Sequence, residues 1–139
     1  MKTLIFSDIH GNLPALEKTI NKTKKVDRYI ILGDVVNYGP WSNECVQLIE
    51  TLKNCIKIKG NHDVNFINKK NSYKDQLSQK FFQACFEEFK EFESLKHYID
   101  EYYENNTKYM HTIDNKYIFQ DTKININYNY FIGHSHRQF

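Results

Sequence analysis

This sequence has no long apolar run, no strong excess of either charge and no cysteines in a C-x-x-C pair. None of its apolar stretches approaches the roughly 20 residues that a helix needs to span a bilayer, so we expect no membrane association. Charged residues make up 26% of the chain and the net charge is +2, which argues against a nucleic-acid-coating protein and against an acidic one. A local basic groove remains compatible with this composition.

Cysteines are few, odd in number and widely spaced, at Cys45, Cys55 and Cys85. No secretory signal precedes the first predicted strand. Both features favour free thiols in a reducing, cytoplasmic setting.

Internal repeats and linker-like stretches are also absent. A chain of 139 residues is long enough to bury a hydrophobic core. We therefore expect a single domain over residues 1–139.

What the sequence does contain begins with three short apolar runs that predict buried strands at residues 2–6, 28–32 and 55–59. Amphipathic stretches separate them, one capped by Asn12 and one starting near Asn43. Their apolar stripes are Leu13, Leu16 and Ile20 in the first, and Cys45, Leu48, Ile49 and Leu52 in the second. This β-α-β-α-β order predicts an α/β fold with parallel strands and right-handed crossovers.

The second half of the chain is less regular. Residues 64–75 hold many turn formers and are expected to form a mobile rim without a regular element, and a helix is predicted from Gln76 to about Ser94. The predicted buried stripe of that helix is Leu77, Phe81, Cys85, Phe89 and Phe92. A hairpin follows, with strands at residues 96–103 and 107–112, and a last strand ends in a continuous run, residues 130–132, that is expected to be buried.

Polar residues follow the predicted strands directly. Asp8 and His10 come after the first, Asp34 after the second and Asn61 after the third. Ligand sites in open α/β sheets lie beyond the carboxyl ends of the strands, so Asp8 and His10 are candidates for the first two ligands of a metal site. Taken alone, an Asp-x-His pair is more often a turn cap beside an ordinary loop histidine.

The positions of the histidines favour the metal interpretation. Five of the six histidines follow predicted strands in turn-like segments, and the exception is His97. The five are His10, His62, His111, His134 and His136. Structural histidines scattered through a core would not be distributed in this way.

Five motifs occur in a fixed order from residue 8 to residue 136. They are Asp8-x-His10, Gly33-Asp34-(x)4-Gly39, Gly60-Asn61-His62-Asp63, a lone His111 and Gly133-His134-Ser135-His136. This ordered set resembles the calcineurin-like metallophosphoesterases. The sequence around Asp8 and Asn37 resembles their small bacterial and archaeal phosphodiesterase branch. The resemblance implies the compact fold of that family, with helices flanking the sheets, and here shortened at the C-terminus.

By the same resemblance, Asp8, His10 and His136 hold one divalent metal. Asn61, His111 and His134 hold the second, and Asp34 bridges both. Such a bridge can keep two cations about 3.5–4 Å apart, so that a hydroxide shared between them attacks phosphorus. The mixed ligands suit Mn²⁺, Ni²⁺, Fe²⁺ or Zn²⁺.

The resemblance makes His62 the catalytic group that stabilises or protonates the leaving oxygen. We further expect Asn12, Tyr38 and Arg137, which adjoin the motifs, to contact the substrate. His111 departs slightly from the family pattern, because Thr112 stands where a glycine often follows.

Three larger departures bear on function. Protein phosphatases of this family carry Asp-Arg where this chain has Asn37-Tyr38, which argues against a phosphoprotein substrate. Relatives usually continue past the Gly-His-x-His motif, so we expect a smaller sheet whose edge a partner subunit could cover. The segment between Asp63 and His111 leaves little material for a cap over the site, and an open site is expected.

Three functions remain in competition. The leading one is a phosphodiesterase acting on a small, nucleotide-type phosphate ester. The second is a nuclease, which would need a basic groove with stacking aromatics; its candidate residues are Tyr38, Trp41, Phe66, Lys69, Lys70 and Arg137. The third is a non-catalytic scaffold of the same fold, which would require lost site residues, and none is missing.

Overall fold

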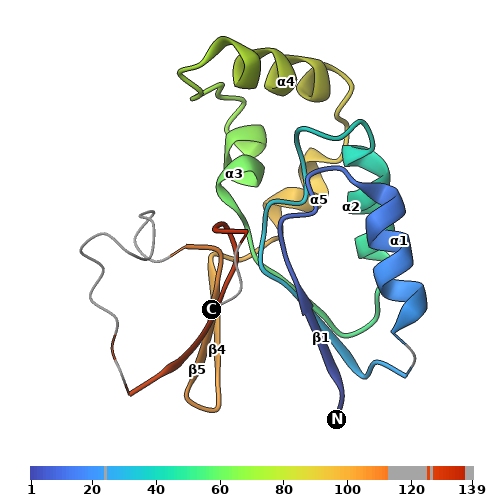
Figure 1. Ribbon diagram of the computed structural model, residues 1–139, viewed down its shortest axis with the longest axis vertical. Coiled ribbons are helices and arrows are strands. Elements are labelled where there is room, and N and C mark those ends of the chain that lie inside the picture. Colours follow the sequence, from blue (N-terminus) through green and yellow to red (C-terminus); the bar gives the residue numbers. More distant parts are fainter. Residues whose placement is uncertain (24, 113–124, 126, 137–139) are drawn as a thin grey trace.

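The computed structural model describes residues 1–23, 25–112, 125 and 127–136. Two three-stranded sheets lie side by side, and helices α1 and α2 cover the outer face of the first sheet (Figure 1). Helices α3 and α4 lie beyond the ends of the strands. This arrangement confirms the expected α/β class.

The first sheet consists of β1 (Thr3–Phe6), β2 (Arg28–Ile31) and β3 (Cys55–Lys57), in that order. Both pairs of strands are parallel, with Thr3 opposite Arg28 and Tyr29 opposite Cys55. The parallel β-α-β-α-β opening predicted from the sequence is confirmed.

The connecting helices are α1 (Leu13–Lys22) and α2 (Ser42–Glu50). Asn12 caps α1, because its Oδ1 accepts a hydrogen bond of 3.2 Å from the amide of Ala15. Leu16 of α1 and Ile49 of α2 are buried against the sheet, as their spacing predicted. Both helices therefore bury the face that the sequence pattern indicated.

A third helix, α3 (Asn61–Ile67), occupies the start of the segment expected to lack regular structure, so that prediction is wrong for residues 64–67. Gly60 is its N-cap residue and donates its N–H to the carboxylate of Asp63 in the first turn. Phe66 is fully buried. Tertiary packing of one aromatic side chain thus stabilises a helix that local composition did not favour.

The single helix predicted from Gln76 to Ser94 is two helices, α4 (Gln76–Glu87) and α5 (Phe92–Lys96). Asn43 of α2 explains the break, because its side chain donates to the carbonyl of Glu88 at 2.8 Å and accepts from the amide of Lys90 at 2.7 Å. These bonds take backbone groups that a continuous helix would use internally.

The buried stripe predicted for this region is wrong at two positions, since Leu77 is 66% exposed and Phe81 is 40% exposed. Phe82 is buried in their place. Its ring centroid lies 5.2 Å from that of Phe66, so α4 packs on α3 through a face rotated from the one predicted.

The second sheet consists of β4 (Glu101–Glu104), β5 (Thr107–Met110) and β6 (Asn129–Ile132). β4 and β5 form the predicted hairpin, although its first strand starts five residues later than expected. α5 extends to Lys96, and Ile99 pairs with Ile58 next to the first sheet instead of with the hairpin. Asn105 and Asn106 form its turn at positive φ, a conformation that asparagine tolerates.

β6 pairs in parallel with β5 at the edge of the second sheet. Phe131 in its centre is 44% exposed, so the prediction that residues 130–132 are buried is wrong. An edge strand has neighbours on one side only, which the sequence pattern could not reveal. Ile124 and Ile126, which alternate with asparagines just before this strand in the sequence, lie outside the described residues.

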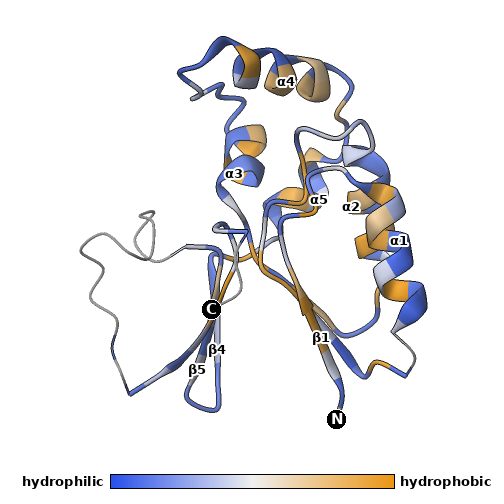
Figure 2. Cartoon of the chain, viewed as in Figure 1, coloured by the Kyte–Doolittle hydropathy of each residue, from blue (hydrophilic) through white to orange (hydrophobic). Residues whose placement is uncertain are grey.

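Apolar side chains gather in two clusters. Figure 2 shows hydrophobic, orange segments in β1 and in helices α1, α2 and α5. The larger cluster lies between the first sheet and the helices, around Ile31, Ile49 and Phe66. The smaller one includes Ile30 and Tyr109 and joins the two sheets. Among the described residues no helix is both long and apolar enough to cross a membrane.

The three cysteines are free thiols, as predicted. Burial raises the pKa of Cys45 to about 12 and that of Cys55 to about 11. Thiols with such a high pKa are scarcely ionised at neutral pH, so these two act as small apolar side chains.

Candidate metal centre

The strand exits of both sheets meet below α3 (Figure 1). The seven predicted metal ligands follow these exits in the sequence. Asp8 and His10 follow β1, and Asp34 follows β2. Asn61 is the first residue of α3, directly after β3 and its short extension. The remaining three follow the second sheet, His111 after β5 and both His134 and His136 after β6.

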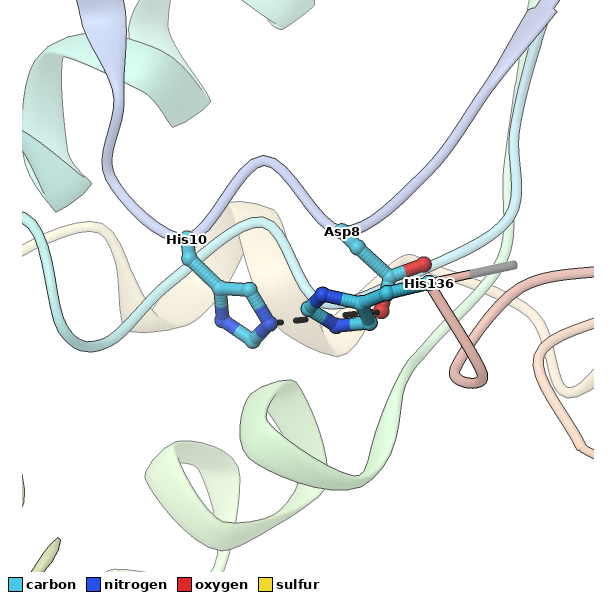
Figure 3. Close-up of side chains that lie close together, drawn as sticks. All are labelled: Asp8, His10 and His136. Carbon is cyan, nitrogen blue, oxygen red and sulfur yellow. Dashed lines mark ion pairs between the residues drawn. The ribbon is translucent and has the colours of Figure 1, made fainter. Parts of the chain in front are cut away.

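A first cluster consists of Asp8, His10 and His136, whose potential ligand atoms lie within 4.8 Å of one another. Figure 3 shows both imidazole rings directed at the Asp8 carboxylate. Asp8 Oδ1 lies 3.1 Å from His136 Nε2 and 3.9 Å from His10 Nε2. The other ring nitrogen of His10 lies 3.3 Å from the carbonyl of Val36, which leaves Nε2 free to face the cluster.

A second cluster consists of Asp34, His111 and His134, again within 4.8 Å. His111 Nε2 lies 3.0 Å from Asp34 Oδ2 and 3.1 Å from the side-chain oxygen of Asn61. The amide oxygen of Asn61 adds an uncharged candidate metal ligand to this cluster. His111 Nδ1 contacts the carbonyl of Leu32 at 2.6 Å and so fixes the ring.

Asp34 connects the two clusters. Its Oδ2 lies 3.0 Å from His111 of the second cluster and 3.9 Å from His10 of the first. Its Oδ1 accepts a hydrogen bond from the backbone N–H of His62 at 2.9 Å. The side chain is buried, and this central position is the one the family resemblance gives to a bridging ligand.

Backbone strain is concentrated at these residues. Five of the seven candidates adopt positive φ, namely Asp8, His10, Asp34, His134 and His136, with values from 48° to 68°. Each such residue costs on the order of 1 kcal/mol, and strain of this kind collects at functional sites. The surrounding hydrogen bonds must therefore hold these turns in place.

One of these supports is the buried carboxylate of Asp63. It accepts hydrogen bonds from the amides of Asp34 at 2.8 Å, Val35 at 3.0 Å, Val36 at 3.2 Å and Gly60 at 2.8 Å. It thereby ties the loop after β2 to the start of α3. Its place in the motif was recognised from the sequence, but its structural role was not.

Two glycines allow these loops to touch. At Gly60 a Cβ would lie 2.0 Å from Asp34 Oδ1, and at Gly33, which has φ +90°, it would lie 2.4 Å from the amide nitrogen of Gly60. A side chain at either position would push Asp34 away from the histidines.

Burial controls the charge of the imidazoles. It lowers the pKa of His10 and of His134, and it lowers the pKa of His62 to about 4. Burial also lowers the pKa of His111, but the hydrogen bond and charge of Asp34 outweigh it and the pKa is raised. Burial raises the pKa of Asp34, yet the bond and charge of His111 outweigh this and keep it lowered. His10, His62 and His134 are therefore neutral at pH 7, the form in which imidazole binds a metal.

The donor set fits divalent cations. Asp8 Oδ2 accepts hydrogen bonds from the Ser7 hydroxyl and from the amide of His134. Asp8 Oδ1 is buried and makes no hydrogen bond with the described residues, although His136 Nε2 lies 3.1 Å from it. A buried carboxylate oxygen that faces only imidazole nitrogens is suited to a cation between them.

His62 lies beside the clusters, with Nε2 3.8 Å from Asp34 Oδ2. Asn37 stands where protein phosphatases of the family carry an aspartate. Two groups contact His62 Nδ1, the side-chain nitrogen of Asn37 at 3.0 Å and the hydroxyl of Tyr73. No motif in the sequence points to Tyr73, which lies in the segment that composition predicts to be a rim.

The three expected substrate contacts differ. Tyr38 is 39% exposed, and its ring lies 5.1 Å from both His10 and His62. The side chain of Asn12 caps α1, and its contact with a substrate remains a prediction. Arg137 lies outside the described residues.

The sequence profile described as calcineurin-like phosphoesterase matches residues 1–138. The chain belongs to the calcineurin-like phosphoesterase family. An uncharacterized protein of Methanocaldococcus jannaschii is 45% identical over 67 residues, covering 47% of this chain and 27% of that protein. A symmetrical bis(5'-nucleosyl)-tetraphosphatase of Buchnera aphidicola is 36% identical over 86 residues, covering 59% of this chain and 31% of the enzyme.

The crystal structure of a metallophosphoesterase from Sphaerobacter thermophilus superimposes with a TM-score of 0.66 at 29% identity. The match covers 78% of this chain and 45% of that one. This calcineurin-like phosphoesterase chain thus spans less than half the length of the relatives it matches here. Its seven strand-exit residues are nevertheless gathered at one centre.

Proposed function

We propose that this chain hydrolyses phosphate diesters with two divalent metal ions. The observation that carries the proposal is the central position of Asp34, within 3.9 Å of a histidine from each cluster. Asp8, His10 and His136 would hold one ion, and Asn61, His111 and His134 the other. The donor set contains no thiolate, which suits Mn²⁺, Fe²⁺, Ni²⁺ or Zn²⁺.

Two cations at such a site polarise a phosphate ester and activate water. The protein groups around them carry only two negative charges, those of Asp8 and Asp34, because imidazole and amide are neutral. The centre therefore keeps a net positive charge that attracts a phosphate anion.

His62 is placed to assist the leaving group. Its Nε2 points toward Asp34 from the rim of the centre, and its ring lies 4.8 Å from that of His10. A hydrogen bond from this nitrogen to the leaving oxygen would lower the barrier for an alkoxide, and positioned acids typically contribute about 10²–10⁴-fold.

The residue at position 38 supports the proposed substrate class. A tyrosine stands where phosphatases of the family carry an arginine. The site therefore lacks that positive side chain to bind the extra negative charge of a monoester. The Tyr38 ring contacts Phe81 of α4 edge to face at 5.6 Å, and both rings are about 40% exposed. This aromatic pair beside the centre would stack on a nucleobase, which fits a nucleotide-type ester. The bis(5'-nucleosyl)-tetraphosphatase relative supports the same class.

Turnover of paired substrates tests the proposal. Bis-nitrophenyl phosphate, mono-nitrophenyl phosphate, cyclic nucleotides and dinucleoside polyphosphates would be assayed with Mn²⁺, Ni²⁺, Co²⁺, Zn²⁺ and Mg²⁺. We expect the bis-substituted ester to react faster than the mono-substituted one. A monoester preference would contradict the diester assignment, and cleavage of single-stranded nucleic acid alone would favour a nuclease.

The His62→Ala variant tests the role of the histidine. It should keep its metal content and lose turnover, with a smaller loss for a nitrophenolate leaving group than for an alkoxide, which needs the hydrogen bond more. Equal losses on both kinds of substrate would refute this role.

The three free thiols fit a reducing compartment such as the cytoplasm.

A further inference from the structure

Tyr73 lies in the segment between α3 and α4, and its hydroxyl ends beside three nitrogen atoms. These are His62 Nδ1, Asn37 Nδ2 at 3.2 Å and Asn65 Nδ2 at 3.3 Å. The hydroxyl is therefore at the centre of a small polar network behind the catalytic candidate His62.

The orientations of the Asn37 and Asn65 amides set the direction of the hydrogen bonds in this network. A side-chain amide nitrogen can only donate, so the Tyr73 oxygen accepts from both Asn37 and Asn65. The Tyr73 proton then has His62 Nδ1 as its acceptor. Asn37 Nδ2 also lies 3.0 Å from His62 Nδ1, so the two donors share the single lone pair of that nitrogen. His62 Nδ1 is therefore an acceptor, and the ring proton must reside on Nε2, on the side of Asp34.

Packing keeps the Tyr73 hydroxyl in this position. The Tyr73 ring stacks on the His62 ring at 5.4 Å with 30° between the planes, and its other neighbour is Phe82 of α4 at 5.9 Å. Burial raises the pKa of Tyr73 to about 12, so the hydroxyl keeps its proton at neutral pH. The geometry thus supplies a donor that is both fixed and protonated.

We propose that Tyr73 is a positioning residue that, together with Asn37, holds His62 as the neutral tautomer with its proton on Nε2. This inference rests on the proposed function, in which Nε2–H is the group that meets the leaving oxygen. A carboxylate at position 37 would instead accept a proton from Nδ1 and favour the opposite tautomer. The pair Asn37 and Tyr73 therefore makes His62 a neutral hydrogen-bond donor.

Nitrogen-15 NMR of the histidine rings tests the tautomer directly, using the full chain both metal-free and loaded with diamagnetic Zn²⁺. In the wild type, His62 Nδ1 should show the shift of an unprotonated nitrogen and Nε2 that of a protonated one. Tyr73→Phe keeps the stacked ring and removes the hydroxyl, so the two shifts should move toward each other. Asn37→Asp should move the proton to Nδ1. Tyr103→Phe, an exposed hairpin tyrosine, is the matched control and should change neither shift.

Kinetics provide the functional readout. Tyr73→Phe should lower kcat about three- to tenfold for esters with an alkoxide leaving group, the size of one lost hydrogen bond, and less for nitrophenyl esters. A protonated Nδ1 in the wild type, or an unchanged spectrum in Tyr73→Phe, would overturn the inference. Absence of any turnover by the wild type would instead overturn the proposed function, since the spectra decide the tautomer without it.

Discussion

At the scale of single residues, Asp34 is the carboxylate that lies near a histidine of each cluster. It is buried, adopts positive φ and lies between the two histidine clusters. Asp34→Asn would remove one of only two negative charges that can hold the cations. We expect this variant to fold and to lose both metals, as measured by elemental analysis after dialysis, together with activity.

Asn12→Ala is the control for Asp34→Asn. The Asn12 side chain caps α1, so its removal should lower stability by about 1 kcal/mol while both metals stay bound. Two metals and most activity in Asp34→Asn would show that another group bridges the ions.

Asp63 acts at the same scale through hydrogen bonds to the backbone. An asparagine in its place would point an N–H₂ group at backbone N–H donors and leave some of the four without an acceptor. We expect Asp63→Asn to lower the free energy of unfolding by about 3 kcal/mol, measured by urea titration. The same exchange at the exposed cap Asp75, where asparagine caps equally well, should change stability little. Equal effects at both positions would remove Asp63 from its supporting role.

At the scale of helices and strands, sequence patterns succeeded where one element contacts one core. Helices α1 and α2 have regular periodicity and bury the faces that their patterns indicate, and β2 is buried as its apolar run indicates. The prediction of buried strands is wrong for β1 and β3, whose residues are only partly buried. The predictions failed where distant side chains decide the outcome. Asn43 interrupts the helix near Glu88, and Phe66 draws α3 and α4 together. No local window contains both partners of such a contact.

The packing of α4 on α3 predicts which phenylalanine of α4 contributes more to the free energy of unfolding. Phe82 is buried among aromatic rings, whereas its neighbour Phe81 is 40% exposed on the same helix. We expect Phe82→Ala to cost about 3 kcal/mol and Phe81→Ala less than about 1 kcal/mol, as measured by thermal or urea unfolding. Similar losses in the two variants would mean that α4 does not pack through the Phe82 face.

At the scale of the whole molecule, the proximity of the candidate ligands was easier to predict than the sheets that carry them. Metal-competent residues occur at strand exits in a fixed order, and that order survives in the sequence even where strand boundaries are uncertain. No comparable sequence pattern indicates the contacts that support the site. Tyr73 reaches His62 across a turn with no motif, and the exposure of Phe131 depends on which side of β6 has a neighbour.

Each proposed metal position draws residues from both sheets, so metal binding should join them. The first cluster combines the exit of β1 with the exit of β6, and the second combines the exits of β2, β5 and β6. We expect two ions per chain by elemental analysis and by titration of the metal-free protein. Free ion at about 100 times its dissociation constant should stabilise the fold by about 2.7 kcal/mol per site, visible as a rise in Tm.

His136→Ala makes this stoichiometry testable one site at a time. His136 belongs only to the first cluster and its side chain is 60% exposed, so the variant should fold normally. It should retain the second ion, bind about one metal per chain and show a smaller rise in Tm. One tight site in the wild type under saturating metal, with no second, would rule out the two-metal mechanism. Loss of both ions in His136→Ala would show instead that the sites form only together, because Asp34 then needs both cations to keep its place between the sheets.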